Sequence, residues 1–477
     1  MTEMSFFWHD YETFGRVPRR DRPSQFAGIR TDAELNEIGP PLELFCQPAP
    51  DTLPDPEACL LTGILPQQCL ERGVPEHRFA AEIEKALALP GTVGVGYNSI
   101  RFDDEVTRHL LWRNLMDPYA REWQNECGRW DLLDVVRCTW ALRPEGITWP
   151  LRDDGRPSFK LEHLTTANGI SHEAAHDAVS DVRATIAMAR LVRQHNPRLW
   201  DFCLKLRKKE NVLAEMGAGR PFWHLSGMYP VERGCLALVW PLAPHPTNKN
   251  ELIVWDLSHD PAELLTLRAD AVRERMFTKQ DALPEGMTRL PIKTIHINKS
   301  PIVIGNLKTL SPELRARYGF DMDTALAHAQ TLGERGATLA GLWPDVFQRP
   351  APEHAPDVDE DLYGGFIGRD DRRLLDRIRS TPAADLSGRS WAFADERLEE
   401  LVFRWRARNF PTTLTEAEQG RWQTLCSERL HQGAGGGLTL SDFFEQLDRL
   451  NEDADERGQD LLSALYDYAE SIAPALD

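Results

Sequence analysis

The sequence predicts an α/β fold at the amino-terminal end, then a β-rich middle part and an all-helical carboxyl-terminal part. Three observations predict this order. Up to about residue 198, short apolar runs typical of strands alternate with the three- and four-residue apolar spacing of helices. From 199 to 349, strand-like runs and proline turns dominate. After a proline-rich linker at 350–357, helical spacing continues over 358–477. We therefore expect domains at 1–198, 199–349 and 358–477.

Each part has its own expected elements. In the first part, strands are expected at 6–12, 25–31 and 93–97, and helices at 76–89, 104–115, 130–142 and 177–195. In the second part, strands are expected at 235–240, 251–257 and 293–297, with a helix at 269–277. In the third part, helices are expected at 372–379, 395–408, 415–430, 440–450 and 460–472.

Composition excludes several classes of protein. The 477 residues include 42% hydrophobic and 27% charged residues, which is enough apolar material for packed cores and excludes wholesale disorder. The net charge of -19, from 55 basic and 74 acidic residues, argues against a protein that coats nucleic acid by bulk charge. It leaves room for an enzyme with a local basic channel.

The chain has the marks of a cytoplasmic protein. No apolar run approaches the roughly 18 residues that a membrane span needs, so we expect no membrane partner. The first ten residues lack a basic region, so no secretory signal is expected. Eight scattered cysteines without a Cys-x-x-Cys pair indicate reduced thiols and not a disulfide framework or zinc ribbon.

The sharpest chemical signal is the pair of acids Asp10 and Glu12, which follows the apolar run Phe6-Phe7-Trp8. Side chains of a strand alternate with period two, so the two carboxylates are expected on the same face. Two such acids repel each other unless a cation lies between them, and their hard oxygen ligands suit Mg²⁺ or Mn²⁺. An edge strand whose acids face water is the alternative.

Two later segments strengthen the first signal. Asp103 is expected near a helix start after the strand and turn at 92–102, where an aspartate also has a simple role as a helix cap. His176 and Asp181 lie five residues apart, around the start of a helix that follows the breaker Asn168-Gly169. Each signal is weak alone, but together they form a specific combination.

This combination resembles the DEDDh exonucleases, a branch of the RNase H-like α/β fold. Further segments resemble the bacterial exonuclease I family, which digests single-stranded DNA from the 3′ end, and they reach from the first third to the last third of the chain. These segments are 9–15, 21–27, 96–108, 129–136, 142–149, 157–164 and 404–411. The resemblance implies an RNase H-like exonuclease domain with a mixed sheet, an SH3-like middle domain and a helical last domain that together enclose the strand.

The resemblance also implies the site. The metal ligands fall on Asp10, Glu12, Asp103 and Asp181, and the catalytic histidine falls on His176. Four carboxylates can hold two Mg²⁺ ions, with Mn²⁺ as an alternative, and such a pair activates water and steadies the leaving 3′ oxygen. Neutral His176 can accept the proton of the water near neutral pH. The expected reaction releases 5′-mononucleotides from 3′ ends of single-stranded DNA, in repair and recombination.

Other functions compete with this interpretation. An exoribonuclease would use the same acids, because nothing in the motifs reports on a 2′-hydroxyl. The segment His172-Glu173-Ala174-Ala175-His176 matches the His-Glu-x-x-His motif of zinc metalloproteases. That motif needs both histidines on one continuous helix, and it leaves the four acids unexplained. A non-catalytic adaptor is disfavoured because all five site residues are present.

Substrate contacts are expected beside Asp103. Tyr119 and Trp123 are four residues apart, which predicts one helical face for stacking bases next to phosphate-binding arginines, although ordinary core packing is the alternative. The resemblance implies that the substrate is held by Glu12, Arg108, Tyr119, Trp123, Arg137 and Lys160. Lys160 stands where the family more usually has arginine, so it keeps the charge but loses a bidentate grip.

Basic clusters at 205–209, 296–299 and 404–410 are candidates for the rest of the path. Arg404, Arg406 and Arg408 lie two residues apart and cannot share one helical face, so we expect some of them to be solvated. The resemblance further implies docking of the acidic tail of single-stranded-DNA-binding protein, with Arg143 and Lys308 as candidate contacts. A monomer is the default expectation.

Overall fold

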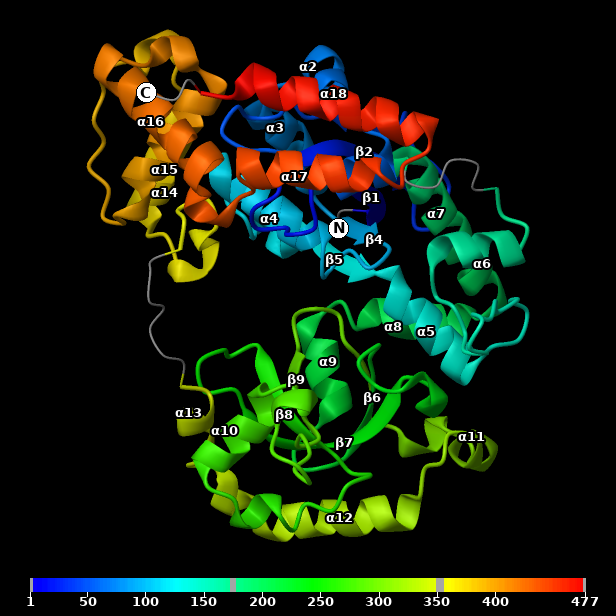
Figure 1. Cartoon of the computed structure of the whole chain (residues 1–477). Helices are drawn as coiled ribbons and strands as arrows, with labels where there is room; N and C mark the ends of the chain where they lie inside the picture. The colour runs from blue at the N-terminus through cyan, green and yellow to red at the C-terminus, as the bar shows by residue number, and fades with distance from the viewer. Residues whose placement is uncertain (1–2, 172–176, 349–355, 475–477) are drawn as a thin grey trace. The chain divides into compact units, whose positions relative to one another are not determined.

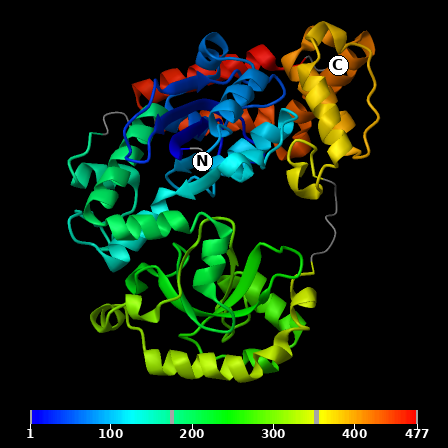
Figure 2. The same cartoon turned by 180° about the vertical axis from the view of Figure 1, so that it is seen from behind.

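The computed structural model describes residues 3–171, 177–348 and 356–474. It divides into two compact units (Figures 1 and 2). The first unit contains Met1–Gly128, His172–Ile186 and His354–Asp477, and the second contains Arg129–Ser171 and Ala187–Glu353. The amino-terminal and carboxyl-terminal parts of the chain therefore fold together.

A five-stranded mixed sheet with the order β3-β2-β1-β4-β5 forms the centre of the first unit. Strand β1 (Ser5–Thr13) is antiparallel to β2 (Pro23–Thr31) and parallel to β4 (Thr92–Gly96). The outer strands are β3 (Leu42–Phe45) and β5 (Gly128–Asp131). The sheet confirms the predicted α/β class. The helix expected at 130–142 was wrong at its start, because residues 128–131 join the sheet before helix α5 (Leu132–Leu142) begins.

Helices α3 (Glu76–Leu87) and α4 (Asp103–Arg113) share a hydrophobic core with the sheet. Phe7 and Phe26 from the strands pack there with Phe79 of α3 and Leu110 of α4, and all four side chains are buried. Burying this apolar face fixes α4 against the sheet, which is the arrangement that brings the start of α4 close to the end of β1. Helices α1 (Pro56–Thr62) and α2 (Pro66–Arg72) precede α3.

The carboxyl-terminal part is helical, as predicted. Its helices are α14 (Arg369–Ser380), α15 (Arg397–Asn409), α16 (Glu416–Gln432), α17 (Leu440–Asn451) and α18 (Glu456–Ile472). Helices α17 and α18 lie side by side in Figure 1 and pack on α1. Their apolar side chains share a core with Phe14 and Cys59, so this helical part and the exonuclease sheet have common hydrophobic cores.

The second unit contains a five-stranded antiparallel sheet with the order β10-β6-β7-β8-β9. Its strands are β6 (Phe222–Leu225), β7 (Leu236–Pro244), β8 (Glu251–Asp256), β9 (Ile292–His296) and β10 (Ile302–Ile304). The helices near it are α8 (Pro197–Lys205), α9 (Lys209–Met216), α10 (Ala269–Phe277), α11 (Pro312–Arg317), α12 (Met322–Arg335) and α13 (Trp343–Val346). Helix α12, which the sequence analysis does not predict, packs on β7. This unit also holds α5 and α6 (Leu161–Ala167), while α7 (Ala178–His195) crosses the boundary between the units.

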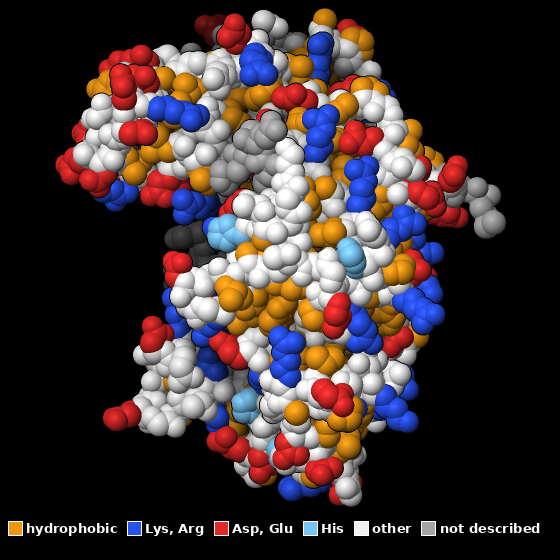
Figure 3. Space-filling model, turned by 90° about the vertical axis from the view of Figure 1, so that its right-hand side faces the viewer, with side chains coloured by type: hydrophobic (Ala, Val, Ile, Leu, Met, Phe, Trp, Pro, Cys, Tyr) orange, Lys and Arg blue, Asp and Glu red, His pale blue; other side chains and the backbone are white. Residues whose placement is uncertain are grey.

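Three further features bear on the class of protein. All eight cysteines are free and buried. Among the described residues, no helix is both long enough and apolar enough to span a membrane. The negative net charge is unevenly spread, because Lys and Arg side chains line the right-hand side of the face in Figure 3.

Candidate active site

Strand β1 presents Asp10 and Glu12 at its carboxyl end. Their partners on β2 are Ala27 and Gln25, so both acids belong to the regular antiparallel ladder. The register shifts between Glu12 and Thr13, which means that the ladder loses its regularity directly after the second acid. Spacing of two along a paired strand places both carboxylates on one face of the sheet.

Helix α7 brings a third carboxylate to this face. One ligand oxygen from each of Asp10, Glu12 and Asp181 can be chosen so that all three lie within 4.8 Å of one another. Asp181 is in the first turn of α7, and its amide donates to the carbonyl of Asp177 at 3.0 Å. The cluster therefore joins residues separated by about 170 positions in the sequence.

Asp103 is the first residue of α4, and its side chain does not cap that helix. Its Oδ1 instead accepts a hydrogen bond from the backbone amide of Tyr11 at 3.1 Å, between the two acids of β1. The turn before it needs Gly96, because a Cβ there would lie 2.9 Å from the carbonyl oxygen of His9 and 2.7 Å from the Cβ of Ser99. Asn98 completes this turn with a φ of 66°. The backbone therefore directs Asp103 toward β1.

The carboxylates raise one another's pKa values. Burial, followed by the negative charges of Asp103, Glu12 and Asp181, raises the pKa of Asp10 well above its ordinary value. Burial and then Asp181 and Asp103 raise the pKa of Glu12 to about 8. The electrostatic cost of crowding these acids is what a bound cation relieves.

The donor set fits a divalent cation with a preference for oxygen. Three carboxylates within 4.8 Å offer hard anionic ligands and no cysteine or histidine, which suits Mg²⁺ or Mn²⁺ better than a structural zinc. Asp103 stands beside this group through its bond to Tyr11. The geometry supports a site for metal-assisted hydrolysis.

Two further residues, adjacent in the sequence just before α7, bear on the site. His176, the predicted catalytic histidine, lies outside the described residues, as does the rest of the His-Glu-x-x-His segment from 172. Asp177 was missed by the sequence analysis. Its Oδ2 accepts from the amide of Ser180 at 3.0 Å, and its charge contributes to the raised pKa values of Asp10 and Glu12. Its position next to His176 was the available signal.

Arg108, a predicted substrate contact, is already engaged by protein groups. Its Nε and Nη2 donate to the two carboxylate oxygens of Glu122 at 2.7 and 2.8 Å, and its Nη1 donates to Glu105 at 2.9 Å. The side chain is 7% exposed. In this structure Arg108 organises the segment after α4, and its guanidinium lies 5.3 Å from the ring centre of Tyr119.

The predicted helical face for Tyr119 and Trp123 was wrong. Tyr119 immediately precedes a short 3-10 helix at Ala120–Glu122, and Trp123 follows it with a φ of -152°. The preceding Pro118 disfavours continuation of α4, and a kink follows at Asn125. Trp123 is nevertheless 66% exposed, so its ring is accessible without sharing a helical face with Tyr119.

Other predicted contacts lie in the second unit. Lys160 is exposed and its Nζ lies 3.4 Å from Glu162, whereas Arg137 forms an ion pair with Asp134 at 2.7 Å. Arg143 and Lys308 are both exposed.

Two exposed aromatic residues near the predicted substrate contacts Tyr119 and Arg108 were missed. Phe366 is 88% exposed and its ring centre lies 6.5 Å from that of Tyr119. Tyr363 is 59% exposed, and its hydroxyl bonds with Arg108 and Glu105. The sequence could not single them out, because exposure of an aromatic ring depends on which distant segment packs beside it.

The expectation that some arginines of 404–408 are solvated was also wrong. All three are buried, because α15 faces acids from distant parts of the chain. Arg406 pairs with Glu418 at 2.7 Å, and Arg408 reaches Asp51 at 2.8 Å and Asp359 at 2.5 Å. These ion pairs connect α15 to other segments of the chain.

Comparison with known proteins decides the family. Three family models match successive parts of the chain: "Exonuclease" over residues 7–189, "Exonuclease I SH3-like domain" over 207–349 and "Exonuclease I C-terminal domain" over 356–472. Exodeoxyribonuclease I of Escherichia coli K12 is 45% identical over an alignment of 478 positions that covers 98% of this chain and 98% of its own. The chain belongs to the exonuclease I family. The predicted order of an exonuclease domain, an SH3-like domain and a helical domain is confirmed.

Solved structures of exonuclease I agree with this assignment. The enzyme from Methylocaldum szegediense is 47% identical with a TM-score of 0.93, covering 98% of this chain and 99% of its own. Exonuclease I of E. coli in complex with a dA16 oligonucleotide is 43% identical with a TM-score of 0.94, covering 99% and 100%.

Two other related structures contain partners. A zinc-bound form of the E. coli enzyme with single-stranded DNA has 42% identity and a TM-score of 0.92. A structure of SSB with exonuclease I and an inhibitor has 42% identity and a TM-score of 0.90. Each covers 99% of this chain and 100% of its own.

Proposed function

We propose that the protein is a 3′→5′ exodeoxyribonuclease that degrades single-stranded DNA to 5′-mononucleotides. The observation that carries this proposal is the convergence of Asp10, Glu12 and Asp181 within 4.8 Å in a chain of the exonuclease I family. Phosphodiester hydrolysis adds water to phosphorus and breaks the bond to the 3′ oxygen. An acidic cluster supports this chemistry when it binds cations that offset the negative charge of the phosphate.

Each acid has a defined part in this proposal. Asp10, Glu12 and Asp181 would hold Mg²⁺, with Asp103 as the fourth carboxylate and Mn²⁺ as a substitute. When bound, a pair of such ions lowers the pKa of water and stabilises the negative charge that develops on the phosphate oxygens. Glu12 lies where the regular ladder ends, so it can also face the terminal nucleotide. His176 would accept the proton of the attacking water, a role that rests on the family resemblance.

Aromatic side chains support a path for unpaired bases. Trp123 and Phe366 are highly exposed, and Tyr119 lies between Phe366 and the guanidinium of Arg108. Exposed rings next to cations are the usual surface for stacked bases of a single strand. We assign Tyr119, Trp123, Tyr363 and Phe366 to this path, with Arg108 as their organiser. Lys160 and Arg137 would contact phosphates.

The same reasoning extends to partners and setting. The acidic tail of single-stranded-DNA-binding protein is the proposed protein partner, supported by the related structure that contains SSB and by the exposed cations Arg143 and Lys308. A monomer in the bacterial cytoplasm, acting in DNA repair and recombination, fits the bacterial origin of the relatives. RNA remains the second candidate substrate, because the acids alone do not discriminate against a 2′-hydroxyl.

The test is digestion of 5′-labelled single-stranded DNA with Mg²⁺ or with a chelator. We expect a metal-dependent ladder that shortens from the 3′ end, and a loss of about a thousandfold or more in Asp181→Ala. Parallel RNA and duplex substrates report the choice of nucleic acid, and casein tests the metalloprotease alternative. A ladder that persists in Asp181→Ala, or in chelator, would contradict the assignment.

A further inference from the structure

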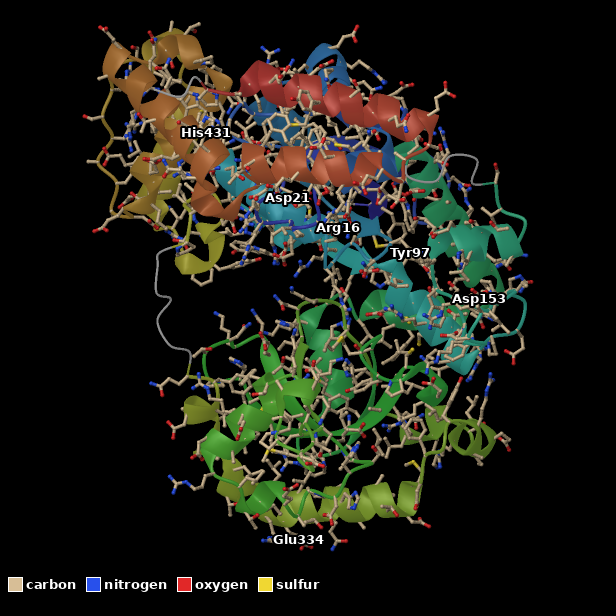
Figure 4. All side chains as sticks on the ribbon, in the orientation of Figure 1. Arg16, Asp21, Tyr97, Asp153, Glu334 and His431 are labelled. Atoms are coloured by element: carbon tan, nitrogen blue, oxygen red, sulfur yellow. The ribbon has the colours of Figure 1, made fainter. Side chains whose placement is uncertain are left out.

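The turn that follows Glu12 is unusually rich in arginine. Residues 14–22 connect β1 to β2 and contain Arg16, Arg19, Arg20 and Arg22. The amide of Phe14 donates to the carbonyl of Arg22 at 2.8 Å, which closes the turn. Inside it, Oδ2 of Asp21 accepts from the amide of Val17 at 2.7 Å, and Figure 4 labels Arg16 and Asp21. Because the strand register shifts at Glu12, the regular ladder alone does not fix the backbone after this residue.

Three of the four arginines of the turn bind an acidic segment of the carboxyl-terminal part, residues 357–360, while Arg16 pairs with Glu57. Glu360 uses both of its oxygens: Oε2 lies 2.8 Å from Nε of Arg19, and Oε1 lies 2.7 Å from Nε of Arg20. Oδ2 of Asp359 lies 3.4 Å from Nη2 of Arg22. Three consecutive contacts therefore join the turn to one short acidic segment.

The acidic segment is itself anchored to two long helices. Asp357 pairs with Arg404 of α15 at 2.7 Å and with Arg429 of α16 at 2.8 Å. Asp359 pairs with Arg408 of α15 at 2.5 Å. Although burial alone would raise the pKa of Asp359, Arg408 and Arg22 hold that pKa well below its ordinary value. Asp359 is therefore charged, and its ion pairs and those of Asp357 fix the segment against α15 and α16.

Apolar packing does not fill the space beside the turn. A cavity of about 240 Å³ lies there, lined by Phe14, Val17 and Arg20 of the turn, by Glu360 and by the glycine-rich loop at 433–437. Phe14 at the start of the turn is packed in the core that it shares with α17 and α18, whereas Val17 is 37% exposed and borders the cavity, so this middle part of the turn has few apolar contacts to restrain it. At the tip of the turn, Glu360 pairs with Arg19 and Arg20, Arg20 also donates to the carbonyl of Gly436, and Arg16 pairs with Glu57 at 2.8 Å. Of these partners, Glu360 is the one that contacts two arginines of the turn.

We infer that the acidic segment of the carboxyl-terminal part positions the metal-binding acid Glu12, with Glu360 as the positioning residue. The ion pairs of Glu360 hold the turn, and the turn holds the end of β1 at the angle that brings the Glu12 carboxylate to Asp10 and Asp181. This inference rests on the proposed function for the role of the metal. In this way the carboxyl-terminal helical part influences catalysis although it does not contact the metal.

The test compares Glu360→Gln with Glu418→Gln in the full-length protein. Glu418 belongs to the same helical part but pairs with Arg406 at 2.7 Å instead of with an arginine of the turn, so it is a matched control. We expect Glu360→Gln to raise the Mg²⁺ concentration for half-maximal hydrolysis about threefold to tenfold, with the rate at saturating Mg²⁺ within about twofold of the unmodified protein. Arg20→Gln, which removes the contact from the other side, should show the same shift.

Calorimetric titration with Mn²⁺ separates this inference from the proposed function, because it measures metal binding without hydrolysis. Weaker Mn²⁺ binding in Glu360→Gln and unchanged binding in Glu418→Gln support the positioning role, whatever the substrate proves to be. Unchanged binding in Glu360→Gln, or an equal shift in both variants, would overturn it. Absence of hydrolysis in the unmodified protein, with Mn²⁺ binding intact, would overturn the proposed function alone.

Discussion

In the metal-free protein, ionisation of Glu12 is unfavourable because this acid is partly buried next to other carboxylates. Its pKa is raised to about 8 by burial and by Asp181 and Asp103, so near neutral pH it resists ionisation. Asp10 is raised for the same reasons, burial first and then the neighbouring acids. A neutral residue of the same shape should relieve this repulsion while removing a ligand.

We therefore expect Glu12→Gln to stabilise the metal-free protein and to abolish its response to Mg²⁺. The free energy of unfolding at pH 7 should rise by about 1–2 kcal/mol, because about 1.4 kcal/mol corresponds to each unit of pKa displacement and solvent screens part of it. Thermal unfolding with and without Mg²⁺ measures both effects. A variant that is less stable than the unmodified metal-free protein would show that the acid is not under electrostatic strain.

His224 provides a pH test of the second unit. It is 4% exposed, its Nδ1 lies 3.0 Å from the hydroxyl of Tyr229, and burial followed by Lys293 lowers its pKa well below 6.5. Below pH 6.5 the imidazole of His224 binds a proton in the unfolded chain but stays neutral in the folded state. Its contribution to the free energy of unfolding is therefore present above pH 6.5 and is lost as pH falls.

The difference in stability between the unmodified protein and His224→Gln should change below pH 6.5 by up to about 1.4 kcal/mol per pH unit. Urea unfolding at pH 7.5, 6.5 and 5.5 measures this difference. Parallel pH profiles for the two proteins would mean that His224 is protonated in the folded state.

Single residues also show what the sequence could predict. The period of two along a strand predicts that Asp10 and Glu12 share a face, and the structure places their oxygens close together. The local pattern could not predict that Asp103 and Asp181 lie near Asp10 and Glu12, because this depends on how α4 and α7 pack. The resemblance to the DEDDh exonucleases predicted it. The catalytic histidine at 176 stays a prediction, because it lies outside the described residues.

At the scale of elements, the connection from β4 to α4 decides where Asp103 lies. Gly96 leaves no room for a side chain, since a Cβ would lie 2.7 Å from the Cβ of Ser99 and 2.9 Å from the carbonyl oxygen of His9. The backbone must shift if this residue is enlarged, and the shift is carried to the first turn of α4.

Gly96→Ala is therefore expected to cost about 1–3 kcal/mol of stability and to reduce hydrolysis by more than the loss of folded protein explains. Gly420→Ala is the control, because Gly420 is inside α16 and, apart from its chain neighbours and the backbone of its own helix, nothing lies within 4 Å of its Cβ position, so alanine there should stabilise the helix. Denaturant unfolding and the rate per folded molecule measure both effects. Full activity in Gly96→Ala would show that the turn tolerates displacement.

Helices and strands were predicted well where the apolar spacing of the segment alone determines the element. The helix expected at 269–277 matches α10, and the expected strands overlap β1, β2 and β4. Prediction failed where tertiary pairing overrides local pattern. Residues 128–131 extend along the sheet before α5, and Tyr119 and Trp123 lie in a kinked segment in place of a helical face.

For the whole molecule, buried ion pairs join the segment between β3 and α1 to the carboxyl-terminal helices within the first unit. Arg408 reaches Asp51 and Asp359, and Arg429 reaches the same two acids at 3.3 and 3.1 Å. The pairs that Arg408 and Arg429 form with Asp51 span 357 and 378 positions (408 − 51 and 429 − 51), so no local pattern could predict them. The spacing of the arginines at 404–408 predicts that they lie on different faces of α15. It does not predict that acids from other parts of the chain pair with the arginines on each of these faces.

Removal of Arg408 should therefore destabilise the first unit strongly. Arg408→Gln removes one of the two cations that Asp51 and Asp359 share, the other being Arg429, and we expect a loss of about 3–5 kcal/mol. Arg421→Gln is the control, because Arg421 pairs with Glu400 at the surface and should cost less than about 1 kcal/mol. Urea unfolding followed by tryptophan fluorescence measures both. Equal losses would mean that the buried network contributes no more than a surface pair.

The most direct test of the central claim is the location of Mn²⁺ in crystals by anomalous diffraction. The account predicts Mn²⁺ bound by carboxylate oxygens of Asp10, Glu12 and Asp181, and loss of that signal in Asp181→Asn. Mn²⁺ bound elsewhere, with these three carboxylates unliganded, would contradict it.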